Sequence, residues 1–133
     1  MMLKTHCFRL TPRQDLKKAL LEYCMSQDLK AATLLSGVGS LSEAQLRLSD
    51  GNKATRLAGP FEIVSLIGTL NAEAVHLHIA ISDSDGKTTG GHLLEGCLIH
   101  TTAEIVLLEI PCVEFQRVHD KNTGYKELTI KAL

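Results

Sequence analysis

Residues 74–81 read AVHLHIAI, a segment in which apolar side chains alternate with small or polar ones. Alternation with a period of two is typical of a β-strand that buries one face. The larger apolar side chains would face the core, whereas His76 and His78 would share the opposite face. Alanines on either side of this histidine pair would leave room for a bound group.

A second strand is expected to bring another histidine beside this pair. Residues 83–86 read DSDG, which is a turn signal, and residues 87–92 read KTTGGH. A hairpin centred on residue 85 places His92 opposite His78, and one centred on residue 84 places it opposite His76. Either register puts His92 on the face of the other two histidines, at the roughly 5 Å Cβ separation of cross-strand neighbours. A register shifted by half a residue would put His92 on the wrong face, and the site would fail. The two glycines before His92 would keep side-chain bulk away from this point.

Three converging neutral imidazoles suit a zinc ion, with nitrogen–zinc distances of about 2.0–2.1 Å and a fourth position for water or a ligand. Nickel, copper or ferrous iron could use the same donors. The alternative is that these histidines are simply polar residues on a solvated strand face, and the spacing alone favours neither interpretation. The metal-site hypothesis places zinc, or another divalent transition metal, on His76, His78 and His92.

The rest of the sequence predicts one helix and many strands. Residues 11–14 read TPRQ, which supplies an N-cap threonine, a proline at the first helical position and a glutamine that closes a capping box. Apolar residues at helical spacing then predict a helix that ends near Gln27. This pattern predicts an α+β fold in which a strongly curved sheet packs against the helix, as a single domain over residues 1–133. The expected strands are residues 3–10, 31–38, 42–48, 53–57, 61–70, 74–82, 87–93, 98–110, 113–119 and 126–133.

Composition restricts the classes of function. The chain has 133 residues, 44% of them hydrophobic and 22% charged, with a formal net charge of −1. A domain that binds nucleic-acid phosphates usually has a basic excess, which is missing here. No apolar run reaches the roughly 18 residues of a membrane span, and the first residues lack a signal core, so a cytoplasmic protein is expected. The four scattered cysteines are expected to be reduced thiols.

Two carboxylates and one strand raise further expectations. The strand at residues 98–110 is apolar on more than one face, so a homo-oligomer is expected to cover it. Glu62 and Glu104 lie in apolar strands, where a carboxylate is costly to bury without a partner. Each is a candidate to orient a ligand histidine or to act as a general base, and the alternative is an ion pair with a basic side chain. His6 belongs to no cluster and is expected to be exposed.

Several motifs together resemble one known family. Their order is similar to that in the PPC domain (plants and prokaryotes conserved), and the resemblance covers nearly the whole chain. It implies a curved, mostly antiparallel sheet, a homotrimeric assembly and, as in some prokaryotic members, a metal on the matching histidines. The motifs are SGVGSL at residues 36–41, GPFEI at 59–63, HLH at 76–78, GGHL at 90–93, TTAE at 101–104 and TGY at 123–125.

The resemblance also implies where partners would bind. In plant members the domain follows Arg-Gly-Arg-Pro hooks that enter the DNA minor groove, and this chain has no such segment. Residues 59–64 resemble a plant stretch linked to trimer and partner contacts, but Pro60 replaces its arginine. Candidates for these contacts are Gly59, Phe61, Glu62 and Ile63.

Three functions follow as hypotheses. The first is a homotrimeric metal-binding protein of the stand-alone prokaryotic type, whose site binds a small molecule or supports assembly. The second is a zinc-dependent hydrolase or lyase, in which the metal activates water. The third is a DNA-associated regulatory protein, as the family label suggests. No residues are assigned a catalytic role.

Overall fold

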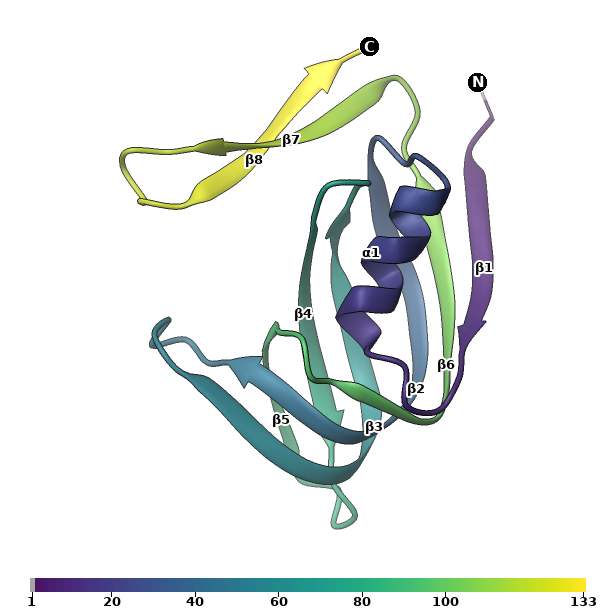
Figure 1. Cartoon of the computed structure of the whole chain (residues 1–133), viewed down its shortest axis with the longest axis vertical. Coiled ribbons are helices and arrows are strands. Elements are labelled where there is room, and N and C mark those ends of the chain that lie inside the picture. Colours follow the sequence, from purple (N-terminus) through teal and green to yellow (C-terminus); the bar gives the residue numbers. More distant parts are fainter. Residues whose placement is uncertain (1) are drawn as a thin grey trace.

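Within residues 2–133, which the computed structural model describes, six strands form one curved sheet in the order β1-β6-β2-β3-β4-β5. Two further strands, β7 and β8, form a separate hairpin, and all the strand pairings are antiparallel. Figure 1 shows helix α1 lying across one face of the sheet. The expected α+β architecture is confirmed. The elements are β1 (Lys4–Leu10), α1 (Leu16–Ser26), β2 (Ala32–Arg47), β3 (Ala54–Leu70), β4 (Val75–Ser82), β5 (Thr88–Leu93), β6 (Leu98–Glu109), β7 (Val113–His119) and β8 (Lys126–Ala132).

Strands β2 and β3 are each one long, bent strand, where the sequence predicted two short ones. Leu41 pairs with Phe61 and Glu43 with Ala58, so one residue of β2 faces the two residues Gly59-Pro60 of β3. A bulge accommodates a proline, which has no N–H to donate, without ending the strand. The bend lets the end of β2 pair with β5 as well, so the sheet curls back on itself (Figure 1).

The helix begins four residues later than predicted. Asp15, rather than Thr11, is the N-cap, and its carboxylate accepts a hydrogen bond from the Lys18 N–H at 3.1 Å. The predicted capping contact does form, since the Thr11 N–H donates to Gln14 Oε1 at 2.7 Å, but it closes a separate turn. Arg13 has a φ of 72°, which is incompatible with a helix, and its N–H donates to the carbonyl of Ile99 in β6.

The core lies between α1 and the face of the sheet that curves around it. Its largest fully buried side chains are Leu16, Leu20, Leu29, Leu41, Leu46, Leu70, Leu77, Ile81, Leu93, Ile99, Ile105 and Leu107. His6 also faces α1 and is only 5% exposed, so the expectation of an exposed histidine is wrong. Its ring is held between the Tyr23 hydroxyl at 3.1 Å and Glu109 Oε2 at 2.9 Å. This hydrogen bond lowers the pKa of Glu109.

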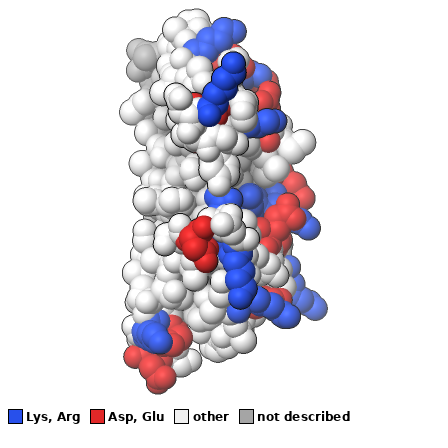
Figure 2. Space-filling model, turned by 90° about the vertical axis from the view of Figure 1, so that its left-hand side faces the viewer, with Lys and Arg blue, Asp and Glu red and all other residues white. Residues whose placement is uncertain are grey.

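The opposite face of the sheet exposes large apolar side chains. Leu35 and Val38 of β2 are 55% and 56% exposed, and Val64 and Ile67 of β3 are both 59% exposed. We call these four residues the outer apolar face. In Figure 2 charged side chains gather toward the right of the molecule, and the left edge carries few of them above one cluster at its lower end. The described part of the chain has no helix of the length and apolarity that crossing a membrane requires.

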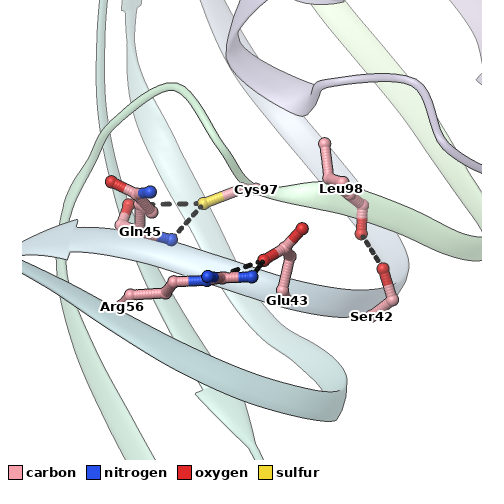
Figure 3. A network of polar contacts seen from close by, with 6 residues as sticks. All are labelled: Ser42, Glu43, Gln45, Arg56, Cys97 and Leu98. Atoms are coloured by element: carbon pink, nitrogen blue, oxygen red, sulfur yellow. Dashed lines mark hydrogen bonds and ion pairs between the residues drawn. The ribbon is translucent and has the colours of Figure 1, made fainter.

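A small polar network holds the curled end of β2 against the loop between β5 and β6 (Figure 3). The Gln45 N–H donates to Cys97 Sγ at 3.3 Å, and the thiol donates back to the Gln45 carbonyl at 3.4 Å. Burial raises the pKa of the Cys97 thiol to about 11, so the group stays protonated and can donate. Beside it, the Arg56 guanidinium donates twice to Glu43 Oε2, at 2.7 and 3.0 Å. These contacts fix the chain two residues before Arg47, which enters the site described next.

Candidate metal centre

The hairpin between β4 and β5 sets the position of the three histidines. The Asp83 carboxylate accepts hydrogen bonds from the backbone N–H groups of Asp85 and Lys87, both at 2.9 Å. The turn is therefore centred on residue 85, and His78 pairs directly with His92. Of the two registers that the sequence allowed, the one centred on residue 85 is confirmed and the one centred on residue 84 is wrong.

The three imidazoles converge on the solvent side of the sheet. Their ring centroids are 5.2 Å apart for His76 and His78, 5.0 Å for His76 and His92, and 5.7 Å for His78 and His92. One ring nitrogen from each lies within 4.8 Å of the other two. Tetrahedral zinc ligands at about 2.0–2.1 Å from the metal are about 3.3 Å apart, so small side-chain rotations would complete the geometry. The donor set therefore fits a zinc ion.

Two glycines let β5 approach its neighbours closely. A Cβ on Gly90 would lie 2.6 Å from the Ile79 carbonyl oxygen, and one on Gly91 would lie 2.8 Å from the Arg47 carbonyl oxygen. Both glycines also line the cavity beside the histidines. They therefore keep bulk away from the site, as the sequence suggested, and allow the strand contacts that hold His92 in place.

Arg47 is a site residue that the sequence analysis missed. It pairs with His92 because the curled end of β2 lies next to β5. Its Nη2 lies 3.4 Å from His92 Nδ1, and a guanidinium can only donate, so this nitrogen acts as the acceptor. No local signal marks this contact, since the two residues are 45 positions apart.

The surroundings keep His76 and His92 neutral. Burial, and then the charge of Arg47, lowers the pKa of His92 to about 4. Burial, and then the charge of Arg117, also lowers the pKa of His76. At neutral pH both rings are therefore uncharged, which is the form that binds a metal ion.

The lowered pKa of His92 predicts a pH-dependent stability of the metal-free protein. Between a pH near 4 and the ordinary histidine range near 6.5, the unfolded chain holds a proton on this ring that the folded chain does not. The free energy of unfolding should therefore fall as the pH is lowered through this interval. NMR titration of the imidazole protons should show His92 charging near pH 4, and His92→Gln should flatten the fall. A His92 resonance that titrates near pH 6.5 would contradict the prediction.

Two adjoining cavities meet at the histidines. One, of about 600 Å³, is lined by all three histidines and by the segment just after Arg47. The other, of about 510 Å³, reaches the β7–β8 hairpin. His76, His92 and Arg47 line both cavities, so the two cavities meet at these residues, and we call them together the histidine space. The hairpin residues at this space were also missed by the sequence analysis, and they are Arg117, Tyr125, Lys126 and Glu127.

The two carboxylates predicted from the sequence lie elsewhere. Glu62 and Glu104 are both exposed, so neither incurs the cost of burial that would require a partner. Glu62 lines a different cavity, with His100, and Glu104 lies between Arg9 and Val38 in the sheet register. The carboxylates that do line the histidine space are Glu73 and Glu127.

The predicted contact segment at residues 59–63 is partly buried in this chain. Phe61 and Ile63 are each 7% exposed and belong to the core. Gly59 is half-buried, and Glu62 is exposed. Within this segment the exposed side chains that can reach a partner are those of Pro60 and Glu62, and the contact itself stays a prediction.

Comparison with known proteins shows one family over most of the chain. The family model of the Plants and Prokaryotes Conserved (PCC) domain, abbreviated PPC above, matches residues 1–111. Over 129 residues the chain is 48% identical to a bifunctional protein GlmU from Synechococcus sp. (strain JA-3-3Ab). This match covers 97% of the chain but 21% of that relative, so the chain spans about a fifth of the length of the longer protein.

Solved structures share the fold. A hypothetical protein from Salmonella is 37% identical with a TM-score of 0.95, over 98% of this chain and 95% of its own. A metal-containing protein from Archaeoglobus fulgidus is 25% identical with a TM-score of 0.82, over 95% and 93% of the two chains. A protein from Bacteroides thetaiotaomicron, described provisionally as DNA-binding, is 22% identical with a TM-score of 0.79, over 94% and 91%. At that last identity the likeness shows the fold alone.

Proposed function

Because the chain belongs to the Plants and Prokaryotes Conserved domain family, we propose that it is a homotrimeric protein that binds a divalent transition metal, with zinc preferred, on His76, His78 and His92. The observation that carries the proposal is the convergence of three imidazole nitrogens within 4.8 Å of one another. The Archaeoglobus relative, which shares the fold at 25% identity, is called metal-containing and supports the proposal.

The open space beside the histidines suggests a role in ligand binding. Three protein ligands leave one position of a tetrahedral ion for water or for a small molecule. Purely structural zinc sites, by contrast, usually have four protein ligands. Because the histidines line cavities of about 600 and 510 Å³, a small molecule has room to reach the ion.

The outer apolar face supports the homotrimer. Its residues Leu35, Val38, Val64 and Ile67 expose apolar area of a kind that usually marks an interaction site. Ile67 is the direct cross-strand partner of His78 and therefore shares its face of the sheet. A second copy bound to this face would lie next to the metal site and could shield it from solvent.

Elemental analysis of protein purified without chelator or affinity metal, together with a solution mass, tests this proposal. We expect about one zinc ion per chain and a mass three times that of the 14.5 kDa chain. Adding zinc to metal-free protein should raise the free energy of unfolding by about 2.7 kcal/mol when free zinc is about 100 times its Kd. Protein that remains metal-free in zinc-containing buffer would refute the metal site, and a monomeric mass would refute the trimer.

A zinc-dependent hydrolase or lyase is the second candidate, and one observation favours it. Glu73 and Glu127 line the same cavity as His76 and His92, so a carboxylate is available to accept a proton. A bound zinc ion would supply Lewis acidity at its open position. This candidate requires turnover of a substrate, whereas the first requires only binding.

DNA binding has weaker support. The relative with that description shares only the fold, and the net charge of this chain is −1. Figure 2 shows positive and negative side chains interspersed rather than one basic surface. A DNA-binding protein should show affinity that falls steeply with salt, and no measurable binding to duplex DNA at low salt would eliminate this candidate.

A further inference from the structure

The β7–β8 hairpin contributes to the histidine space although it lies beyond residues 1–111, which the family model matches. It supplies Arg117 from β7 and Lys126 and Glu127 from β8 to the cavity that His76 lines. The Synechococcus and Salmonella relatives match 97% and 98% of the chain, so their likeness includes the hairpin region. The hairpin is therefore a candidate to decide which ligand this branch of the family accepts.

Specific contacts fix the hairpin relative to the histidines. Phe115 is 8% exposed, and its carbonyl accepts a hydrogen bond from Asn71 Nδ2 at 2.7 Å. Asn71 Oδ1 in turn accepts from the N–H groups of Glu73 and Ala74, at the start of the strand that carries His76. Two residues after Phe115, Arg117 Nη2 donates to Thr69 Oγ1 at 3.0 Å, and Thr69 is the cross-strand partner of His76. A preorganised guanidinium thus lies beside the histidines.

The charges around this space favour an anion. The positively charged residues that line it are Arg47, Arg117 and Lys126, and the negatively charged ones are Glu73 and Glu127. Glu127 is already engaged, since it accepts a hydrogen bond from the Thr123 hydroxyl at 2.8 Å. Histidine binds a metal in its neutral form, so three histidine ligands would leave the charge of a divalent ion uncompensated. With the ion present, the space would carry a clear positive excess.

Binding of a metal would also release Arg47. A neutral imidazole has one nitrogen with a free lone pair, and the other nitrogen carries a proton. The Arg47 guanidinium uses that lone pair when it donates to His92 Nδ1. A metal bound to either nitrogen takes the lone pair, so Arg47 loses its acceptor and its donors become available to a ligand.

We infer that the histidine space takes a small anionic ligand whose carboxylate or phosphate group is held by Arg117 and Arg47. The ligand's position beside a metal rests on the proposed function, whereas the two arginines belong to this chain whether or not a metal binds. A guanidinium binds both groups well, because its planar fork matches their oxygens in a bidentate arrangement. Since metal binding frees Arg47, zinc and the anion should each strengthen the binding of the other.

Calorimetric titration with inorganic phosphate and with malonate tests the inference, on zinc-loaded and on zinc-free protein. Arg117→Gln should weaken binding of the preferred probe about ten- to hundredfold, the loss typical of charged hydrogen bonds. The zinc content, measured after each titration, should not change. Arg117→Lys should restore part of the affinity. Arg9→Gln, in β1 and outside both cavities, is the matched control, because Arg9 also donates to a threonine hydroxyl, and it should bind as the wild type does.

The outcomes separate this inference from the metal proposal. Arg117-dependent binding in a protein that never holds zinc would refute the metal site and keep the anion site. Binding of phosphate alone would identify a phosphate-bearing ligand, and binding of malonate alone a carboxylate. If Arg117→Gln binds both probes as tightly as the wild type does, or if neither probe binds wild-type protein at millimolar concentration, the inference is wrong.

Discussion

Replacing His78 with alanine is expected to abolish stoichiometric zinc binding while the chain keeps its fold. His78 is the central ligand candidate, with His76 on its own strand and His92 directly opposite. Loss of a residue that merely orients a metal ligand typically costs about 10–100-fold in affinity, so loss of a ligand should cost more than about 100-fold. Because the side chain is exposed, its truncation should change the stability of metal-free protein by less than about 0.5 kcal/mol.

The matched control is His100→Ala. His100 is also exposed and lies on a strand of the same sheet, but it lines a different cavity. Zinc titration by competition with a chelator, with circular dichroism of each metal-free protein, makes the comparison. Zinc affinity should fall in His78→Ala and stay at the wild-type level in His100→Ala. Equal affinities in the two variants would mean that the histidines do not hold the ion.

The part of the site that the sequence predicted depends on local geometry. Alternation along residues 74–81 fixes the face of His76 and His78, and the DSDG turn brings His92 to the same face in either register. The turn's own hydrogen bonds to Asp83 then select one register, a choice that spacing alone does not make. The convergence of the three histidines was therefore predictable from residues 74–92.

The part that the sequence did not predict depends on contacts between distant segments. Arg47 reaches His92 only because β2 is bent and pairs with β5, and Arg117 reaches the site only because the hairpin is attached through Asn71. Hydrophobic pattern was a poor guide at Glu104, which stands in a strand that is buried on one face and exposed on the other. The exposed face of β6 also carries apolar residues, which a single chain leaves uncovered. The proposed homotrimer would cover them.

Replacing Gly39 with alanine is expected to destabilise the fold strongly. Gly39 of β2 is buried and pairs directly with Ala103 of β6. A Cβ at this position would lie 2.0 Å from the carbonyl oxygen of Thr102 and 2.7 Å from the Cα of Ala103. These are backbone atoms of a central strand, so the two strands would have to separate. We expect a loss of about 3 kcal/mol in the free energy of unfolding, measured in urea on metal-free protein at one fixed concentration.

Gly37→Ala is the matched control, because it makes the same change two residues away in the same strand. Its Cβ would meet only side-chain atoms, with Leu66 Cδ2 nearest at 2.9 Å. A leucine side chain can shift its rotamer, and alanine also restricts the unfolded chain, so the cost should not exceed about 1 kcal/mol. If the two variants lose the same stability, the effect belongs to glycine replacement in general. A larger loss at Gly39 would instead show that close contact between the β2 and β6 backbones is what requires glycine there, in the strand whose far end carries Arg47 to the histidines.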